Sequence, residues 1–432
     1  MKRRVAVTGL GVVSPLGHDV QSTWTQLFSG HSGIDVIQQF DASAFPTYIA
    51  AEVKNFKPRP QFNRKSTRFA HRFTHFALEA AYQALEDAGI KPSQSDAARW
   101  GVVTGSGMMT ADYDYLLRFQ KVCAPQGEID WSLLKAKSHD FFALNDFGQT
   151  TSNTGLSLLA EQFGIRGYTS SVHTACASGG QALGLARNVI LRGDADVILA
   201  GGFDSMISPL GLSSFCLLGA LSTDNDTPQT ASRPFDKTRN GFVLGEGAAF
   251  LILEEWEHAL SRGALIYAEL AGEGNSLSSY RITDSHPNGD GAVQAIRRAL
   301  DSANVSASDI DYINAHGTST KMNDLSETNA IKAVFKEHIG QLPVSSTKSQ
   351  TGHLIAAAGA LEAVFSVLSL YEGRIPPTAN LKNPDPECDC DYVTEGPREK
   401  TLRAVLSNSF GFGGSNSCLL FKHKAFKEMS AS

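Results

Sequence analysis

The stretch that decides the fold of this chain is Ser170-Ser171-Val172-His173-Thr174-Ala175-Cys176-Ala177-Ser178-Gly179-Gly180. A short β-branched and polar run ends at one cysteine and a run of small residues follows, which predicts a strand that gives way to a helix at Cys176. Over residues 177–192, Ala, Leu, Gly, Val and Ile recur at helical spacing with almost no charge, and Gly193 can end the helix. Cys176 is therefore predicted to stand at the N-terminus of a helix that is buried on most sides.

The position of Cys176 makes it a candidate nucleophile. Unpaired N–H groups and the positive end of the helix dipole favour a thiolate, so we expect the pKa of this thiol to lie below its free value of about 8.5. Free cysteine is also among the most buried residue types, and then acts as a small hydrophobic side chain. A catalytic cysteine needs a histidine that the fold brings close, and His316 and His353 both stand at expected element ends.

Composition and charge restrict the class of protein. Apolar residues make up 42% and charged residues 19% of the 432-residue chain, which predicts a globular protein, and the net charge of -6 gives no basic field for nucleic acid. The first residues form too short an apolar run for a signal peptide, and no stretch reaches the roughly 18 apolar residues of a membrane span. We therefore expect a cytoplasmic protein without membrane contact. The six cysteines are scattered, and the pair Cys388 and Cys390 lacks a second ligand pair, so neither a disulfide framework nor a metal site is expected.

Strands and helices are predicted to alternate along the chain, which indicates an α/β protein with mostly parallel sheets. The expected strands cover residues 4–13, 100–104, 195–201, 250–253, 266–271 and 311–315. The expected helices cover residues 66–88, 155–163, 177–192, 291–303, 324–335 and 354–370. Because the pattern restarts after about residue 260, we expect a duplicated unit with halves at 1–258 and 259–425.

Two further segments place polar side chains at expected element ends. The run Tyr312-Ile313-Asn314-Ala315-His316-Gly317-Thr318-Ser319-Thr320 puts a histidine just past a buried strand, where sites of α/β proteins form. The run Ser345-Ser346-Thr347-Lys348-Ser349-Gln350-Thr351-Gly352-His353 opens a small-residue helix with a lone acid, Glu362. Because an unpaired buried carboxylate is costly, Glu362 needs a partner, which Lys348 or His353 can supply.

A glycine-rich loop completes the set of candidate segments. The run Asn408-Ser409-Phe410-Gly411-Phe412-Gly413-Gly414-Ser415-Asn416 joins two strand-like runs through three glycines. Such a loop can bring backbone N–H groups close to a ligand or move as a gate. Any one of these segments is more often structural than functional, but four of them around one cysteine indicate an active site.

Together the segments resemble the β-ketoacyl-acyl carrier protein synthases, most closely the type II elongating enzymes and related type II polyketide ketosynthases. The resemblance runs from Val5 to about Phe421 and rests on Thr174–Gly179, Asn314–Thr320, Thr347–His353 and Gly411–Gly414. It implies a thiolase-like fold with two related halves in a layered αβαβα arrangement, usually as a homodimer.

The resemblance implies an acyltransferase that performs a decarboxylative Claisen condensation. Cys176 would take an acyl group from an acyl carrier protein thioester, and malonyl on the carrier would then lose CO2 and extend the acyl chain by two carbons. His316 and His353 would stabilise the enolate oxygen, while the backbone N–H groups of Cys176 and Phe412 would form an oxyanion hole. Lys348 and Glu362 would organise the site around His353.

The resemblance also assigns residues to substrate and carrier binding. Thr318 and Thr320 match positions that bind the phosphopantetheine arm, Phe412 matches a gate, and Gly413 beside it matches a substrate-binding position. Met108 falls where relatives line the acyl pocket at the dimer interface, and its flexible thioether could set the acyl length.

A basic cluster precedes the helix expected at 66–88. Arg64, Lys65 and Arg68 lie where relatives dock the acidic carrier protein, so we expect docking there. The 4'-phosphopantetheine arm would arrive on the carrier, so no cofactor and no metal are implied.

One region departs from the family pattern and leaves the pathway open. The segment 109–153 is longer and less regular than in fatty acid synthases. It contains an unusual group of aromatic residues, Trp131, Phe141, Phe142 and Phe147. An altered pocket would suit a specialised polyketide or polyene ketosynthase that works with a non-identical chain-length partner. The non-catalytic partner itself usually lacks the nucleophile, and a thiolase or acyl-CoA-primed starter synthase would replace His316 or His353 with a second cysteine or an asparagine.

Overall fold

Each half of the chain builds the same series of elements. The structure, a computed structural model, describes residues 3–62, 67–68, 70–93, 96–107, 113–141, 153–281 and 283–429. The first half contains β1 (Val5–Val13), α3 (Arg72–Ala88), β4 (Trp100–Ser106), α7 (Thr154–Phe163), β5 (Thr169–Val172), α8 (Ser178–Arg192), β6 (Val197–Ser205) and β7 (Glu246–Glu255). The second half contains β8 (Ala268–Leu277), α12 (Asp290–Ala303), β9 (Tyr312–Asn314), α13 (Lys321–Phe335), β10 (Pro343–Ser345), α15 (Ala358–Glu372), β14 (Ala404–Phe410) and β15 (Ser415–Lys422).

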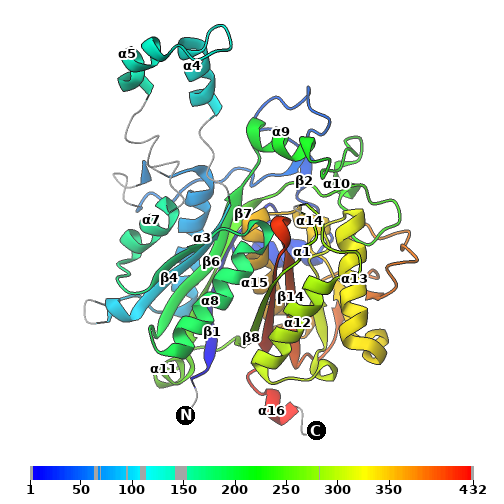
Figure 1. Cartoon of the computed structure of the whole chain (residues 1–432). Helices are drawn as coiled ribbons and strands as arrows, with labels where there is room; N and C mark the ends of the chain where they lie inside the picture. The colour runs from blue at the N-terminus through cyan, green and yellow to red at the C-terminus, as the bar shows by residue number, and fades with distance from the viewer. Residues whose placement is uncertain are drawn as a thin grey trace.

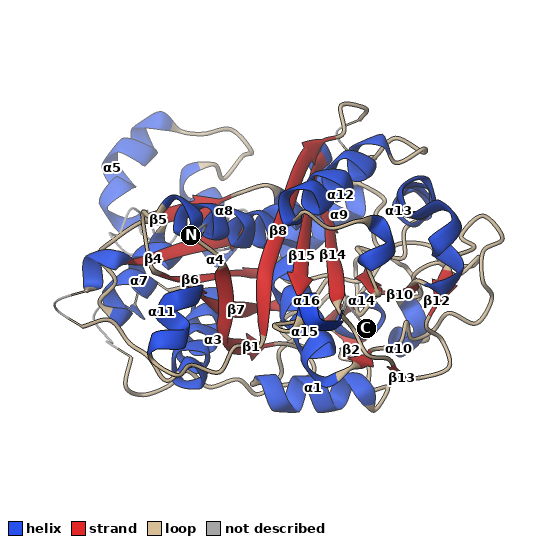
Figure 2. Ribbon diagram, turned by 90° about the horizontal axis from the view of Figure 1, so that it is seen from below, coloured by secondary structure: helices blue, strands red, loops and turns tan. Residues whose placement is uncertain are grey.

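The strand pairing repeats in the same way. In the first half β5, β4 and β6 pair in parallel, and β7 and β1 follow in antiparallel pairs. In the second half β10, β9 and β14 pair in parallel, and β15 and β8 follow in antiparallel pairs. The antiparallel pair β1–β8 joins both sets into one 11-stranded sheet, which β12 (Asp391–Tyr392) extends beyond β10. Figure 2 shows this continuous series from β5 to β12.

The predicted α/β class and duplication are confirmed, but the expectation of mostly parallel strands is wrong. Half of the pairings in the large sheet are antiparallel, and all of these lie in its middle. A parallel neighbour requires a crossover connection, whereas an antiparallel neighbour does not. β15 returns beside β14 after a short turn, and β7 returns beside β6 after a longer connection that contains α9 (Pro209–Leu217) and α10 (Pro228–Ala231). The boundary between residues 258 and 259 stays a prediction.

The halves pack as five layers around two central helices. Helices α8 and α15 contact strands of both halves, while α3 and α7 cover the outer face of the first half and α12 and α13 that of the second (Figure 1). The largest apolar cluster lies around the two central helices, and a smaller one lies under each outer layer. The resulting αβαβα arrangement is the thiolase-like fold that the sequence predicted.

Small residues let the central helices approach each other closely. A Cβ on Gly179 would lie 2.8 Å from the backbone N of Ala360, and a Cβ on Gly359 would lie 2.8 Å from the backbone N of Gly180. Helix α8 ends as predicted at Gly193, which adopts a left-handed φ of 84°. Helix α3, Arg72–Ala88, covers most of the helix expected at 66–88.

The prediction that no stretch reaches the length of a membrane span is wrong for one helix, α15 with its lead-in turn. Residues Ile355–Glu372 have the length and composition for one, with a mean hydropathy of 1.4, but 89% of this window is buried inside the protein. The apolar side chains of α15 therefore pack in the protein core, because both halves of the molecule enclose this helix.

The remaining elements lie around this layered body. Helices α4 and α5 stand outside it (Figure 1). The remaining helices and strands of the described residues are α1 (Val20–Phe28), β2 (Ile34–Val36), β3 (Ile49–Ala51), α4 (Tyr113–Cys123), α5 (Trp131–Phe141), α9 (Pro209–Leu217), α10 (Pro228–Ala231), α11 (Trp256–Ser261), α14 (Lys348–Thr351), β11 (Arg374–Ile375), β13 (Arg398–Glu399) and α16 (Phe426–Met429). The short 3-10 turns are η1 (Ala97–Arg99), η2 (Ala175–Ala177), η3 (Ala307–Asp309), η4 (Lys336–Gln341), η5 (Ile355–Ala357) and η6 (Phe412–Gly414).

Candidate active site

Cys176 stands in the 3-10 turn η2, directly before α8. Ala175 adopts a left-handed φ of 50°, a conformation that costs about 1–3 kcal/mol and is found most often at functional sites. The Cys176 side chain is only 2% exposed. The predicted position at the start of a buried helix is therefore found, with a sharp backbone turn that the sequence did not indicate.

His353 contacts the cysteine from the other half of the molecule. Its Nε2 lies 3.0 Å from the Sγ of Cys176. The backbone N–H of His353 donates to the carbonyl of Val243 (2.7 Å), and the N–H of Gly245 donates to the carbonyl of His353 (2.9 Å). The ring of Phe242 packs edge-on against the imidazole, with 5.3 Å between centroids. Backbone and ring of His353 are thus both fixed.

His316 is the second buried histidine at the cysteine. Its ring lies edge-to-face to that of His353 with centroids 5.3 Å apart. The carboxylate of Glu327 accepts 2.8 Å hydrogen bonds from the backbone N–H groups of His316 and Gly317, which holds the turn after β9. The donor atoms of Cys176, His316 and His353 lie within 4.8 Å of one another, close enough to contact one metal ion. The expectation of no metal site stays a prediction.

Lys348 is the partner of the buried acid Glu362. The two side chains form an ion pair and are 1% and 2% exposed. Burial raises the pKa of Glu362 to about 7, and Lys348 opposes this rise. Of the two partners that the sequence left open, the fold selects the lysine.

The electrostatics of Cys176 reverse the expectation from its helix position. Burial raises the pKa of the thiol to about 12, although Lys348 and the backbone N–H groups of Phe412 and Cys176 itself lower it. Burial and the nearby Lys348 hold the pKa values of His316 and His353 well below the usual range. The helix terminus does favour the thiolate, but removal from water dominates, so the resting site holds a neutral thiol and neutral imidazoles.

A cavity of about 430 Å³ leads from the surface to Cys176. Thr318, Thr320 and Phe412, three of the predicted substrate-contacting residues, line it together with both histidines. The hydroxyl oxygens of Thr318 and Thr320 lie 3.0 Å apart, so they face one part of the wall. The cavity is large enough for an extended chain that reaches the sulfur.

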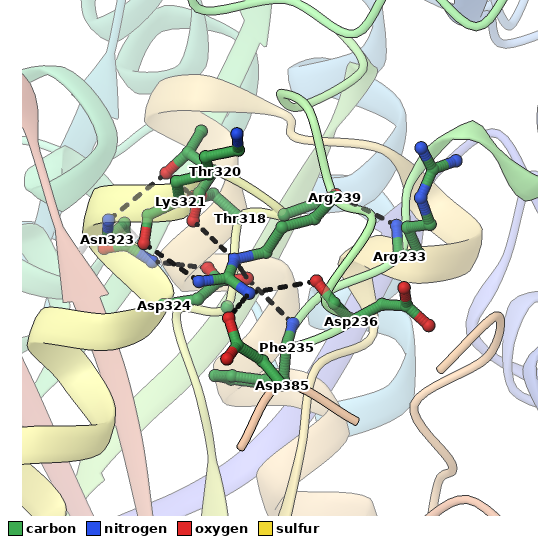
Figure 3. Close-up of polar contacts among 12 residues, drawn as sticks. Arg233, Phe235, Asp236, Arg239, Thr318, Thr320, Lys321, Asn323, Asp324 and Asp385 are labelled. Atoms are coloured by element: carbon green, nitrogen blue, oxygen red, sulfur yellow. Dashed lines mark hydrogen bonds and ion pairs between the residues drawn. The ribbon is translucent and has the colours of Figure 1, made fainter. Parts of the chain in front are cut away.

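An arginine fixes the loop that carries the two threonines. Arg239 donates hydrogen bonds to the carbonyls of Thr320 (3.1 Å) and Lys321 (3.0 Å) and pairs with Asp385 at 2.6 Å (Figure 3). Figure 3 also shows Asp324, which lies 3.6 Å from the same guanidinium. The wall with the threonines is thus tied to two other loops.

The remaining predicted residues are placed less directly. Arg68 is exposed, and Gly413 follows Phe412 with a left-handed φ of 79° but does not line the cavity. The positions Arg64, Lys65 and Met108 lie outside the described residues.

Sequence reasoning missed Glu327, Arg239 and Asp204, three buried charged residues around the site. Asp204 closes the apolar run expected as a strand at 195–201, and an acid at the end of a buried strand was the available signal. Glu327 and Arg239 act on backbone groups of distant segments, for which the sequence carries no local signal.

Comparisons with known proteins agree with this geometry. Two family sequence models match, "Beta-ketoacyl synthase, N-terminal domain" over residues 2–259 and "Beta-ketoacyl synthase, C-terminal domain" over residues 267–382. The chain is 44% identical over 424 residues to the 3-oxoacyl-[acyl-carrier-protein] synthase 2 of Coxiella burnetii (strain RSA 493 / Nine Mile phase I), covering 97% of this chain and 98% of the relative.

Solved structures give the same result. A type II PKS ketosynthase in complex with its acyl-carrier protein and bound to the hexaketide matches with a TM-score of 0.87 and 35% identity over 98% of this chain and 99% of that one. The ishigamide ketosynthase/chain length factor matches with a TM-score of 0.87 and 33% identity over the same shares. With the site geometry, these matches show that the chain belongs to the β-ketoacyl synthase family.

Proposed function

We propose that this chain is a 3-oxoacyl-acyl carrier protein synthase, an acyltransferase that extends an acyl chain by two carbons through decarboxylative Claisen condensation. The observation that carries the proposal is the contact between His353 Nε2 and Cys176 Sγ at 3.0 Å, with His316 beside them, at the end of a cavity. Family membership at 44% identity over nearly the full length supports the same chemistry.

The first step transfers the acyl group to the cysteine. The Sγ of Cys176 attacks the carbonyl carbon of an acyl-carrier thioester, and the thiol proton passes to Nε2 of His353. The backbone N–H groups of Cys176 and Phe412, which both face the sulfur, stabilise the negative oxygen of the tetrahedral intermediate. The carbon–sulfur bond to the carrier then breaks, and the leaving thiolate takes the proton from His353.

The second step forms the new carbon–carbon bond. Malonyl on the carrier loses CO2, and the electron pair of that bond moves into an enolate whose oxygen accepts a hydrogen bond from the N–H of His316. His353 donates a second hydrogen bond from Nε2, once its ring proton has moved there from Nδ1. The enolate carbon attacks the carbonyl carbon of the acyl group on Cys176. The bond from that carbon to Sγ then breaks and leaves its electron pair on Sγ, which takes a proton from solvent to restore the thiol. The low pKa values of both histidines fit this role, because a neutral imidazole can donate without carrying a charge in the buried site.

Lys348 and Glu362 support the histidines from behind. The lysine charge lowers the pKa of both imidazoles, and Glu362 holds the ammonium group in place. Thr318 and Thr320 bind the phosphopantetheine arm along the cavity wall, and Phe412 gates the inner end, beside the substrate-binding position Gly413. No diffusible cofactor takes part in these steps.

A second candidate function is a polyketide or polyene ketosynthase that pairs with a non-identical chain-length partner. The similarity to the ishigamide ketosynthase/chain length factor over 98% of this chain favours it. The two functions share the chemistry above and differ in the acyl chain and the partner.

The partners follow from the proposed chemistry. The carrier protein docks on the basic cluster Arg64, Lys65 and Arg68, and Met108 limits the acyl length. The proposed form is a homodimer in the cytoplasm. The position of β5 at the edge of the large sheet supports the homodimer, because an edge strand can pair with a second chain. If Arg68→Glu leaves the rate with carrier-bound substrate unchanged at low salt, the docking assignment is wrong. If Met108→Gly leaves the chain-length profile unchanged, the assignment of Met108 as the residue that limits the acyl length is wrong.

The test is intact-mass spectrometry with a panel of acyl-carrier thioesters, with the wild type beside Cys176→Ala. We expect acyl adducts on the wild type alone and, after addition of malonyl-carrier, release of a β-ketoacyl chain two carbons longer. The acyl donor that reacts fastest separates fatty acid from polyketide substrates. Absence of any adduct would exclude a stand-alone synthase and point to a missing partner subunit.

A further inference from the structure

One buried carboxylate beside the active site has no part in the steps above. Asp204 is the last residue but one of β6 and is 2% exposed. Its Oδ2 accepts a 3.0 Å hydrogen bond from the backbone N–H of Ala356, in the turn η5 that leads into α15. A Cβ on Gly107 would lie 2.2 Å from the same oxygen, so the absence of a side chain there leaves room for the carboxylate.

Backbone dipoles stabilise the charge of this carboxylate. Burial raises the pKa of Asp204 to about 7, and the N–H groups of Ala356 and Ser205 oppose the rise. The N–H of Ala356 belongs to the start of a central helix, where the helix dipole also favours a negative charge. Asp204 therefore covers the backbone N–H of the second residue of η5, the turn that leads into α15.

The equivalent place in the other half holds no side chain. β14 is the counterpart of β6 in the repeated strand order, and Gly411 follows its last residue. A Cβ on Gly411 would lie 3.2 Å from the backbone N of Cys176, which stands in η2 where Ala356 stands in η5. The second amide of the turn before one central helix is thus covered by a carboxylate, and the equivalent amide before the other helix is open to the cavity.

We propose that Asp204 is a positioning residue for the condensation, which holds the start of α15 and thereby keeps His353 against Cys176. The inference rests on the proposed function, because it assigns Asp204 to the step in which His353 acts. It also explains why only one of the two equivalent amides is open to substrate: Asp204 covers the amide at Ala356, and Gly411 leaves the amide at Cys176 uncovered.

The backbone around His353 shows how Asp204 can act through it. On one side, Val243 and Gly245 bind the backbone of His353 at 2.7 and 2.9 Å. On the other side, Asp204 binds the N–H of Ala356, three residues further along. With both sides held, the imidazole keeps its 3.0 Å contact to the sulfur. Loss of the second anchor frees the turn on which the ring direction depends.

Asp204 has a second, electrostatic effect that a purely structural residue would not have. The charged groups that act on the Cys176 thiol are Lys348, which lowers its pKa, and Asp204, which raises it, and the neutral rings of His353 and His316 complete the surroundings. Removal of the carboxylate charge is therefore expected to make the thiol more reactive while it makes the condensation slower.

The test compares Asp204→Asn, which keeps an acceptor oxygen for Ala356, with Asp204→Ala, which removes it. Asp311→Asn is the matched control, because Asp311 is also buried and its carboxylate also accepts a backbone N–H, that of Arg403 at 2.7 Å. Asp311 precedes β9, at the opposite end of that strand from His316. The measurements are kcat and KM with acyl-carrier and malonyl-carrier, iodoacetamide alkylation of Cys176 from pH 6 to 9.5, and thermal unfolding.

We expect Asp204→Ala to lower kcat about tenfold or more with KM nearly unchanged, and Asp204→Asn to lose less. Above pH 7 both variants should alkylate up to about tenfold faster than the wild type, and the curves should converge at lower pH, where the wild-type carboxyl is protonated. Asp311→Asn should change neither kcat nor the rate of alkylation. If Asp204→Ala fails to fold, Asp204→Asn still shows the faster alkylation and the smaller loss of kcat.

The proposal requires both a lower kcat and a faster alkylation of Cys176 in the Asp204 variants. A lower kcat with an unchanged alkylation curve would mark a merely structural residue and overturn it, and so would wild-type kcat in both Asp204 variants. Failure of the proposed function is distinct, because it appears in the wild type as absence of the β-ketoacyl product.

Discussion

The two halves of the molecule present the same turn and helix to its centre, but different side chains stand there. η2 and η5 begin with Ala175 and Ile355 at left-handed φ values of 50° and 47°, and each leads into a central helix. The second residue of the turn is Cys176 in one half and Ala356 in the other. The backbone that presents the proposed nucleophile is therefore a property of the repeated unit, and only one of the two copies carries a cysteine there.

The connections before the two turns differ more than the turns do. Two residues, 173–174, join β5 to η2, whereas nine residues, 346–354, join β10 to η5. The longer connection carries Lys348 and His353, and both act on the cysteine of the other half. One half thus supplies the cysteine proposed as nucleophile and the other supplies the lysine and the histidine beside it, so neither half contains the whole proposed site.

The largest expected effect comes from breaking the ion pair that only the second half contains. Lys348→Met leaves the carboxyl of Glu362 buried without its partner, and we expect a loss of about 3–5 kcal/mol in the free energy of unfolding, measured in urea. Counted from the turns, Glu362 stands where the first helix has Ala182. The double variant Lys348→Met with Glu362→Leu should regain most of the stability but no condensation activity. Equal stability of the single variant and the wild type would contradict the prediction.

A smaller effect is expected when the open amide of the first half is covered. In Gly411→Ala the new Cβ would lie 3.2 Å from the backbone N of Cys176, where the proposed oxyanion binds. We expect acylation of Cys176 by acyl-carrier, followed by intact mass, to slow by about 100-fold or more. Gly340→Ala serves as control, since no atom lies within 4 Å of a Cβ there. Acylation at the wild-type rate would show that the amide is not used.

The two histidines that precede the turns sharpen the comparison further. His353 lies three residues before Ala356, and His173 lies three residues before Cys176. His353→Ala should lower the rate of condensation about 100-fold, because a donor to the enolate is lost. His173→Ala should stay within about threefold of the wild type, since among the described residues its ring forms hydrogen bonds with Ser106 and Ser171, at distances of 3.0 Å or more. Equal losses in the two variants would contradict the assignment of His353.

The smallest effect tests the thiol itself through its pH dependence. The pKa of Cys176 is raised to about 12 by burial, so the thiol is protonated at neutral pH and its thiolate fraction grows tenfold with each pH unit. Alkylation by iodoacetamide in the absence of substrate should therefore still rise at pH 9.5, beyond the point at which an exposed thiol levels off near about 8.5. A plateau below pH 8 would show that the helix terminus outweighs burial.

Local sequence patterns predicted the elements that carry the site. The small-residue run after Cys176 and the glycine that ends the helix, Gly193, are short-range features, and the structure has both. The alternation of strands and helices also predicted the duplicated α/β fold. It did not predict the antiparallel middle of the sheet, because the direction of a strand depends on which neighbour it finds in the folded protein.

Long-range packing decided the properties of the site. The sequence predicted a lowered pKa for Cys176 from its helix position, but the degree of burial that raises the pKa arises only when both halves enclose the turn. Arg239 and Asp385 are 146 positions apart, and Asp204 and Ala356 are 152 positions apart, so neither pair could be predicted from the sequence.

The amino-acid sequence by itself identified the candidate nucleophile, the two histidines, the lysine and the glycine-rich loop, because each is a residue type placed at the end of a local element. Only the tertiary structure decided which of two equivalent helix starts is open, which partner neutralises Glu362 and which charge state the cysteine keeps. The physical reason is range: caps, turns and helical spacing act over a few residues, whereas burial and charge pairing depend on groups that meet only after the chain has folded.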